Sequence, residues 1–383
     1  MAFRDSKLPG VGTTIFTVMS RLAAETGAIN LGQGFPDFQP PARLCELVAS
    51  HLAAGHNQYA PMAGLPALCE AISEQAARRY GWTIDAAREV TITAGATEAI
   101  FAAIHAVVCA GDEVVLLDPS YDSYGPAATL TGARLVRVPL TLPDFRIDFD
   151  RLAAAISPRT RLLIVNTPLN PAGAVLDSGD WERIADLLEP HDAYLLSDEV
   201  YDSIVFDGRR HVGALAHERL RERAFGVYSF GKTYNATGWK IGYCVAAPEL
   251  MGEFRKVHQY LTFSVSTPIQ YAIAEFMRES PRFADGLAPF YQERRDRFIA
   301  LLEGSRFGIR RTAGTYFQLA EYSAVSDLPD TEFCVELTRR HGVAAIPLSP
   351  FCNEPPRARL VRFCFAKDDA TLQRAASQLQ GVR

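Results

Sequence analysis

Seven short apolar runs alternate with amphipathic stretches through the middle of this chain, and their order constrains the fold more than any other feature. The runs are 90–93, 113–117, 135–138, 161–165, 193–197, 225–230 and 241–246. Helical patterns lie between several of them, as at 97–109 and 181–188. Alternation of this kind predicts an α/β fold with a mostly parallel sheet and helices on both faces. A Gly-containing loop joins the last two runs, which predicts one antiparallel strand.

The two ends of the chain carry different patterns. Residues 1–40 contain Gly and Pro and show little periodicity, so we expect an N-terminal arm that forms part of a smaller domain. The C-terminal region predicts a small α+β domain, with helices at 289–302 and 331–341 and apolar runs at 309–311, 316–321 and 359–365. We therefore expect a large domain at 41–284 and a small domain at 285–383. The active crevice is expected between them, at the carboxyl ends of the parallel strands.

Composition excludes several classes of function. A net charge of −5 over 383 residues gives no basic footprint for nucleic acid or membrane surfaces. No run of about 18 apolar residues predicts a membrane span. The seven cysteines form no CxxC pair and most lie among apolar residues, which favours reduced core thiols in a cytoplasmic protein. The eight histidines show no HxH or HExxH spacing, so we expect no metal site.

One motif points to a different class of protein. The segment 226–233, GVYSFGKT, fits the P-loop pattern GxxxxGK[ST], and the acidic residues at 198–199 resemble the end of a magnesium-binding strand. However, the variable positions of a P-loop form a flexible loop before a helix. Here they are Val-Tyr-Ser-Phe, which favours a strand, and no helical pattern follows Lys232. The acidic motif also precedes the lysine motif, the reverse of the usual order, so we reject a nucleotide hydrolase.

Polar side chains follow three of the predicted strands. They are Asn170, then Asp198 and Tyr201, and finally Lys232. Because parallel strands end at one edge of a sheet, these groups are expected to converge. A lysine can bind the aldehyde of a cofactor covalently, an aspartate can keep a ring nitrogen protonated, and Tyr and Asn can bind a ring oxygen. The combination predicts a site for pyridoxal 5′-phosphate.

Further motifs identify a family resemblance. They are INLGQGFPDF at 29–38, NQY at 57–59, NPAG at 170–173 and VRFCFAKD at 361–368. With the Lys232 segment, they make the chain resemble class I/II aminotransferases, of fold type I among pyridoxal-phosphate enzymes. The chain is most similar to the branch of kynurenine/glutamine aminotransferases and bacterial methionine aminotransferases. The resemblance covers about residues 9–379 and implies a seven-stranded, mostly parallel sheet in a large domain, with a smaller α+β domain.

The resemblance implies a role for each cofactor-binding residue. Lys232 matches the lysine that binds the cofactor covalently, Asp198 the partner of the ring nitrogen, and Tyr201 and Asn170 the ligands of the ring oxygen. Tyr121 matches the aromatic residue that stacks on the ring. The phosphate ligands match Gly95, Ala96, Thr97, Ser229, Lys240 and, from the other subunit, Tyr59. Many relatives in the wider class have arginine where this chain has Lys240, which keeps the charge but not the bidentate geometry.

The substrate site is implied in the same way. Gly34, Asn170 and Arg362 match the residues that bind the α-carboxylate. Phe16 and Phe263 lie where relatives have aromatic residues of the substrate pocket, although both could equally be ordinary core residues. Phe263, like Tyr59, would come from the partner subunit, so the resemblance implies a homodimer with a shared active site.

The implied activity is a ping-pong transfer of an amino group from an L-amino acid to a 2-oxo acid. Lys232, Asp198 and Tyr201 are the expected catalytic residues. No match exists for a second arginine that would bind a distal carboxylate, so we expect an apolar, sulfur-containing or aromatic donor. Methionine is the first choice, followed by kynurenine, glutamine, Phe and Tyr. Two alternatives stay open, a carbon–sulfur β-lyase with the same cofactor and an aminotransferase-like regulator.

Overall fold

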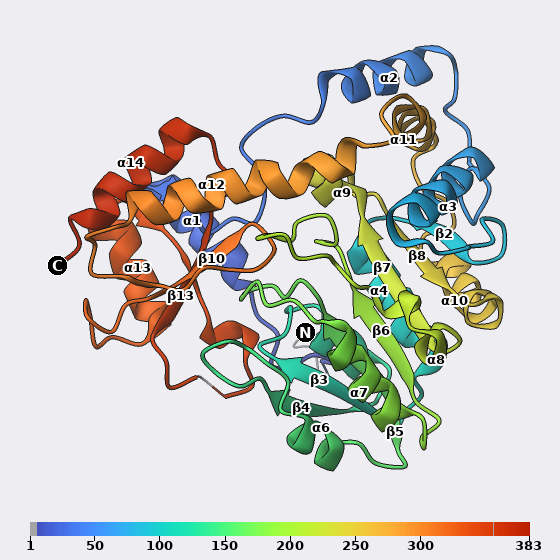
Figure 1. Ribbon diagram of the computed structural model, residues 1–383, viewed down its shortest axis with the longest axis horizontal. Coiled ribbons are helices and arrows are strands. Elements are labelled where there is room, and N and C mark those ends of the chain that lie inside the picture. Colours follow the sequence, from blue (N-terminus) through green and yellow to red (C-terminus); the bar gives the residue numbers. More distant parts are fainter. Residues whose placement is uncertain (1–5, 355) are drawn as a thin grey trace, which may run out of the picture.

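A seven-stranded sheet forms the centre of the larger part of the molecule (Figure 1). The computed structural model describes residues 6–354 and 356–383. The strand order is β2-β8-β7-β6-β5-β3-β4, and β8 alone runs antiparallel to its neighbours. The strands are β2 (Val90–Thr93), β3 (Glu113–Asp118), β4 (Arg134–Pro139), β5 (Thr160–Asn166), β6 (Tyr194–Asp198), β7 (Ala224–Ser229) and β8 (Gly242–Ala246). The predicted sheet and its single antiparallel strand are confirmed.

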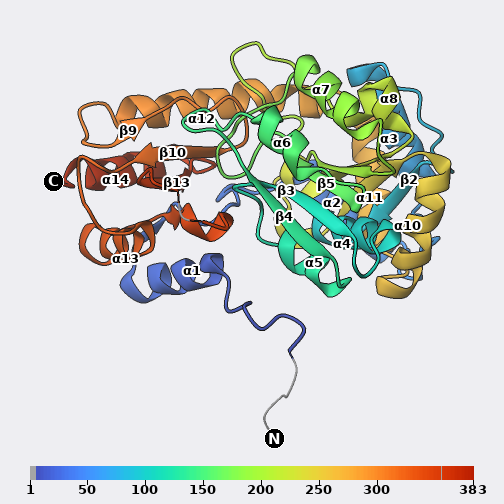
Figure 2. The same cartoon turned by 90° about the horizontal axis from the view of Figure 1, so that it is seen from below.

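Helices cover both faces of this sheet (Figure 2). One face packs against α4 (Ala96–Val107), α5 (Tyr124–Leu130) and α10 (Pro248–Leu261). The other face carries α3 (Pro66–Tyr80), α6 (Phe149–Ala155), α7 (Ser178–Leu188) and α8 (Glu218–Arg221). At the edge of the sheet, α2 (Ala42–Ala53) packs on α11 (Thr267–Glu279). Because β3 is buried along its whole length, it shows the continuous apolar pattern of a doubly covered strand rather than alternation.

A second group of elements surrounds a four-stranded sheet of order β12-β13-β10-β9. Its strands are β9 (Gly308–Ile309), β10 (Phe317–Glu321), β12 (Ile346–Pro347) and β13 (Leu360–Cys364). Helices α12 (Leu287–Leu301), α13 (Asp330–His341) and α14 (Asp369–Gln380) pack around it and share one apolar core with the sheet. The remaining strands, β1 (Ile29–Asn30) and β11 (Val343–Ala344), pair in parallel. This confirms the smaller α+β region, while the domain limits at 41 and 285 stay predictions.

The N-terminal region differs from its prediction. Residues 15–26 form helix α1 (Ile15–Thr26), whereas the sequence suggested an arm without periodic structure. Thr14 caps the helix by accepting a hydrogen bond from the amide of Thr17, and Gly27 ends it in the left-handed conformation with φ 67°. Helix α1 packs on α13 and β11, so this segment contacts the smaller region as expected. Residues 1–5 of the predicted arm lie outside the described residues.

The seven cysteines are all unpaired thiols, as expected. Four of them are buried, whereas Cys45 and Cys109 are exposed, so the prediction that the thiols belong to the core holds only for some of them. Across residues 6–354 and 356–383, no helix combines the length and the apolar character that a membrane span needs.

Candidate active site

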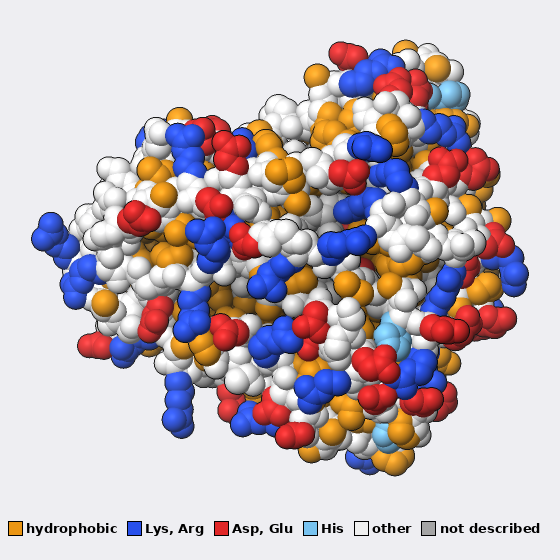
Figure 3. Space-filling model, in the orientation of Figure 1, with side chains coloured by type: hydrophobic (Ala, Val, Ile, Leu, Met, Phe, Trp, Pro, Cys, Tyr) orange, Lys and Arg blue, Asp and Glu red, His pale blue; other side chains and the backbone are white. Residues whose placement is uncertain are grey.

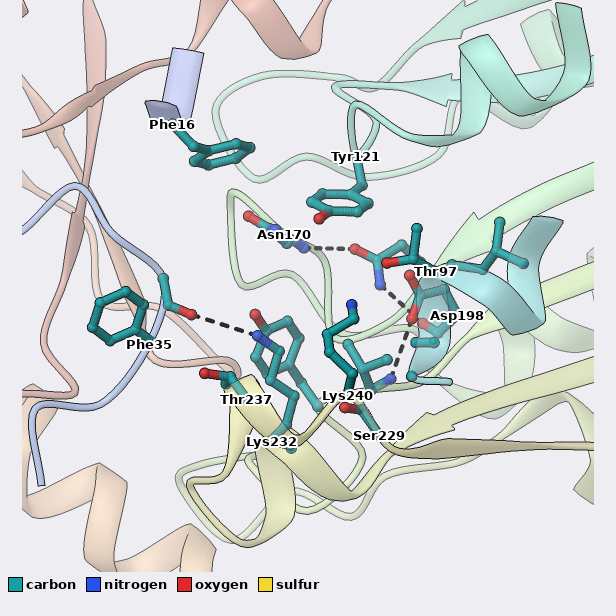
Figure 4. Close-up of a pocket in the computed structure, with 18 of the residues that line it drawn as sticks. Phe16, Phe35, Thr97, Tyr121, Asn170, Asp198, Ser229, Lys232, Thr237 and Lys240 are labelled. Atoms are coloured by element: carbon teal, nitrogen blue, oxygen red, sulfur yellow. Dashed lines mark hydrogen bonds between the residues drawn. The ribbon is translucent and has the colours of Figure 1, made fainter. Parts of the chain in front are cut away.

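A cavity of about 390 Å³ lies at the carboxyl ends of β5, β6 and β7, where they face β13. Every predicted site residue except Tyr59 and Phe263 lines it. Figure 4 shows the side chains of Lys232, Asp198, Tyr121 and Lys240 around one common space. The expectation that the strand ends converge is therefore met, because the register of the sheet places Asn166 directly beside Asp198.

Lys232 lies in a single helical turn, α9 (Phe230–Thr233), directly after β7. The predicted strand ran one residue too far, so the lysine follows the strand rather than ending it. Its Nζ donates to the hydroxyl of Tyr316 at 3.0 Å and lies 3.4 Å from the carbonyl oxygen of Gly34. Burial lowers the pKa of the Lys232 amine to about 8, and the positive charge of Arg362 acts in the same direction. At this pKa about a tenth of the amine is neutral at pH 7, far more than for an ordinary lysine, and the neutral amine is the reactive form.

Asp198 ends β6 and is buried beneath the cavity. The hydroxyl of Tyr124 donates to its Oδ2 at 2.5 Å, and the amide of Val200 donates to its Oδ1 at 3.3 Å. Burial raises the pKa of this carboxyl to about 6, against the lowering effect of the Tyr124 hydrogen bond. A cationic partner inside the cavity would stabilise the ionised form of this buried carboxylate.

Arg362 projects from β13 and is fully buried. Its Nη1 donates to Oδ1 of Asn170 at 2.7 Å and its Nη2 to the carbonyl oxygen of Gly32 at 2.8 Å. The guanidinium lies 3.9 Å from the ring centre of Phe317. Its Nε has no hydrogen-bond partner, and no carboxylate in the described part of the chain pairs with the group. Burial disfavours the charged form of Arg362 and so lowers its pKa. An incoming carboxylate would compensate that buried positive charge, so the group is suited to bind one.

The amino end of α4 forms a cradle for an anion. Gly95 precedes the helix with φ 76°, and the first amides of a helix have no partner within it. The Nζ of Lys240 lies 3.4 Å from the position that a Cβ on Gly95 would take, so the lysine amine lies directly beside this turn. Ala96, Thr97 and Ser229 line the same part of the cavity. Helix dipole, free amides and lysine together suit a phosphate group.

Aromatic side chains also line the cavity. The ring centres of Phe16 and Tyr121 are 6.5 Å apart, and both residues line the cavity. Tyr201 packs edge-on against Tyr316 with ring centres 5.1 Å apart. Phe16 is thus placed in the pocket wall rather than in a closed core.

Tyr59 and Phe263 lie outside the cavity. Their rings contact each other at 5.4 Å in an edge-on arrangement, and the residues are 83% and 45% exposed. Within one chain they cannot serve as pocket residues, and the alternative that Phe263 belongs to the core is wrong. Their predicted contribution from a partner subunit stays a prediction.

Three important neighbours were absent from the sequence-based site. Tyr124 binds Asp198, Tyr316 binds Lys232, and Asn166 donates to the backbone carbonyl oxygen of Asp198 at 2.9 Å. Asn166 follows a predicted strand, as the other polar site residues do, so its position was a usable signal. Tyr316 reaches the lysine only through the packing of the smaller sheet.

Comparisons with known proteins agree with this geometry. The family model "Aminotransferase class I and II" matches residues 26–379. A methionine aminotransferase of Escherichia coli is 53% identical over 98% of this chain and 97% of its own length. A probable N-succinyldiaminopimelate aminotransferase of Mycobacterium tuberculosis is 40% identical, with 98% and 97% covered. The mouse kynurenine–oxoglutarate transaminase 1 is 33% identical, with 96% and 95% covered.

A solved structure of an Escherichia coli methionine aminotransferase superposes with a TM-score of 0.97 at 52% identity, with all of both chains covered. This similarity extends over the large sheet, the smaller sheet and the segments that enclose the cavity. The chain belongs to the class I and II aminotransferases, and its architecture is fold type I.

Proposed function

We propose that this protein is a pyridoxal-phosphate-dependent aminotransferase that takes the amino group of methionine, and of related apolar or aromatic amino acids, and transfers it to a 2-oxo acid. The observation that carries the proposal is one cavity holding a lysine with a lowered pKa, a buried aspartate and a buried arginine without an acidic partner. Each group matches one requirement of the reaction: a base, an anion opposite the cofactor ring and a carboxylate clamp.

The residues present fit the cofactor. The cradle at Gly95, Ala96 and Thr97 suits its phosphate, and Lys240 adds a positive charge beside it. Asp198 suits the protonated ring nitrogen, which would supply the cationic partner that a buried carboxylate lacks. When bound, pyridoxal phosphate supplies the electron sink that stabilises negative charge at the substrate α-carbon. The ligand roles of Tyr201 and Asn170 at the ring oxygen and of Tyr121 above the ring belong to the same proposal.

Lys232 moves the proton in this mechanism. As a neutral amine its Nζ accepts the α-proton of the substrate and later returns a proton to the other reacting carbon. Burial favours the neutral form, and the hydroxyl of Tyr316 and the carbonyl oxygen of Gly34 hold the amine at one edge of the cavity. Two fixed partners limit the positions of a flexible side chain and so orient the proton transfer.

Arg362 binds and orients the substrate α-carboxylate. Its guanidinium is held by Asn170 and by the carbonyl oxygen of Gly32, so the fork is positioned before substrate arrives. The backbone of Gly34 packs closely against the ring of Phe317 beside this site, since a Cβ on Gly34 would lie 2.9 Å from that ring. A larger residue would therefore reduce the space beside Arg362.

The cavity favours an uncharged donor side chain. Its cationic lining residues are Lys232, Lys240 and Arg362, and each already has a role in the proposal. Phe16, Phe35 and Tyr121 provide apolar surface instead. Methionine fits such a wall because its thioether is flexible and packs well on aromatic rings. The 53% identity to a methionine aminotransferase supports the same choice.

The protein is further proposed to act as a cytoplasmic homodimer. The exposed surface around Tyr59, Tyr260 and Phe263 is unusually aromatic for a free surface, which favours burial against a second copy. In that dimer Tyr59 would reach the phosphate and Phe263 the substrate pocket of the partner.

A panel of amino donors and 2-oxo acceptors with the purified holoenzyme tests the proposal. We expect methionine to have the highest kcat/KM, aromatic amino acids, kynurenine and glutamine to react, and aspartate and glutamate to react poorly. Release of pyruvate and ammonia from a cysteine conjugate, faster than any amino transfer, would instead identify a β-lyase. A preference for dicarboxylic donors would contradict the proposed pocket.

A further inference from the structure

A second cavity of about 390 Å³ lies on the other side of the segment that follows β6. Five arginines line it, from the end of α3, the loop at 209–210 and the turn before α12: Arg78, Arg79, Arg209, Arg210 and Arg282. In Figure 3, basic side chains gather on the face between α3 and the right-hand end of α12. Among the described residues, none lines both this cavity and the catalytic one.

Positive charge dominates this second cavity. Arg79 pairs with Asp202 at 3.1 Å and lies 3.5 Å from Asp285. These are the only acidic residues of the lining, and the other four arginines form no ion pair with any described residue. Five arginines against two aspartates leave an excess of three positive charges, in a chain whose net charge is −5. Like charges held around one concave surface concentrate the potential there and attract anions.

The floor of the cavity is a fixed network. Arg79 donates to Oδ2 of Asp202 and to the hydroxyl of Ser203, at 3.1 and 2.8 Å, and the hydroxyl of Tyr80 donates to the same Oδ2 at 2.5 Å. Burial alone would raise the pKa of Asp202, but Arg79 and His211 hold it below its usual range. Asp202 is therefore ionised and paired with Arg79, so the excess of positive charge lies on the other four arginines.

One ring nitrogen of a buried histidine in the lining has no hydrogen-bond partner among the described residues. The side chain of His211 is 2% exposed, and its Nε2 lies 2.8 Å from Oε2 of Glu199. Its Nδ1 is buried and makes no hydrogen bond within the described chain. Buried polar atoms are seldom left without a partner, and this one belongs to a residue of the cavity lining. This observation is independent of the arginine charges.

We propose that this cavity binds a small anion carrying two or more negative charges, such as a pyrophosphate or a tricarboxylate. The volume lies in the range of small-molecule sites, and exposed guanidinium groups bind phosphates and carboxylates alike through charge-assisted hydrogen bonds. The site stands apart from the proposed transamination, because it neither shares residues with the catalytic cavity nor depends on the cofactor.

The two cavities nevertheless share one stretch of backbone. Val200 and Tyr201 line the catalytic cavity, and the next two residues, Asp202 and Ser203, line the second one. An anion that moves Arg79 therefore acts on Asp202, which is directly bonded to Tyr201.

Calorimetric titration of the holoenzyme with inorganic pyrophosphate, and separately with citrate, at low ionic strength tests this proposal. The cavity variant is Arg209→Gln/Arg210→Gln, which removes two exposed arginines that form no ion pair with described residues. The matched control is Arg339→Gln/Arg340→Gln, an adjacent exposed pair on α13 with the same change in net charge. Thermal melting verifies that each variant is folded.

We expect at least one anion to bind the wild type, with a Kd that rises about tenfold or more in the cavity variant and less than about twofold in the control. Tighter binding of pyrophosphate would identify a phosphate ligand, and tighter binding of citrate a carboxylate ligand; either supports the site. The proposal is overturned by absence of binding at millimolar concentration, by equal weakening in the control, or by binding that the cavity variant leaves unchanged.

Discussion

The amine of Lys232 donates a hydrogen bond across 3.0 Å to the hydroxyl of Tyr316, which in turn donates to the carbonyl oxygen of Gly34 at 2.7 Å. Tyr316→Phe removes this acceptor without changing the pocket wall, so the lysine loses one of its two fixed partners. We expect kcat with methionine to fall about tenfold, roughly the value of one hydrogen bond, while KM changes less than about twofold. Steady-state kinetics measures both constants.

Tyr322→Phe is the matched control for this variant. Tyr322 is also buried in the smaller region, and its hydroxyl donates to the carbonyl oxygen of Leu328 at 2.9 Å, away from the lysine. It should lose a similar amount of stability and keep its kcat. If both variants lose activity in proportion to their stability, Tyr316 has only a structural role.

The lowered pKa of Lys232 predicts how the apoenzyme takes up its cofactor. Only the neutral amine attacks an aldehyde, and burial places its pKa near about 8. Below that pH the rate of the covalent step should fall about tenfold per pH unit, and above it the rate should level off. Stopped-flow absorbance measures this step. The Lys232→Ala variant should show no such step. The reaction of free Nα-acetyl-lysine with pyridoxal phosphate should keep accelerating toward pH 10. A rate of apoenzyme loading that also rises to pH 10 would contradict the assignment.

Arg362 is predicted to serve every donor alike. Arg362→Ala should lower kcat/KM about 100-fold or more for methionine, phenylalanine and kynurenine equally, because all three carry the same α-carboxylate. Arg362→Lys keeps the charge but loses the fork that now contacts Asn170 and Gly32, so we expect only partial recovery. An effect confined to one donor would show that Arg362 recognises side chains.

Asp198 is predicted to lower the stability of the cofactor-free protein. Its folded pKa, about 6, is above the usual 3.8, so the folded state binds the proton more tightly than the unfolded chain. Ionisation between about pH 4 and 6 therefore removes stability, and the loss is complete above pH 6. At pH 8, apo Asp198→Asn should be more stable than the wild-type apoprotein by about 1–3 kcal/mol, with the difference shrinking toward pH 4. Urea denaturation at pH 4, 6 and 8 measures this.

Asp202→Asn provides the opposite case for comparison. Arg79 and His211 keep the pKa of Asp202 below its usual range, so its charge stabilises the fold at pH values above that range. The same substitution there should lower stability at pH 8. If both substitutions lower the free energy of unfolding by a similar amount, the ionised Asp198 does not destabilise the apoprotein and the prediction is wrong.

The sheet could be predicted because its strands are buried on both faces. Continuous apolar runs such as β3 can be recognised without tertiary information. Once β5 and β6 are recognised, their ends predict where the polar site residues that follow them lie. Helix α1 was missed although Thr14 and Gly27 mark its ends, because a short segment rich in Gly and Pro on either side obscured its single apolar face.

The rest of the site depends on how distant segments meet. Tyr316 lies directly before β10, and nothing local to it indicates that its hydroxyl would approach a lysine 84 residues earlier. Tyr124 reaches Asp198 from the first turn of α5, where its ring could equally have been packing. Such contacts arise from the packing of helices and sheets on one another, which the pattern of a single segment does not contain.

The segment from Val200 to Ser203 forms part of the wall between the two cavities, because its first two residues line one and its last two line the other. With an anion bound as proposed, natural variation in the outer arginines would alter turnover without changing any group that contacts the amino acid. Homologues with the same catalytic set could differ in their response to metabolite levels simply by exchanging residues on the far side of that wall.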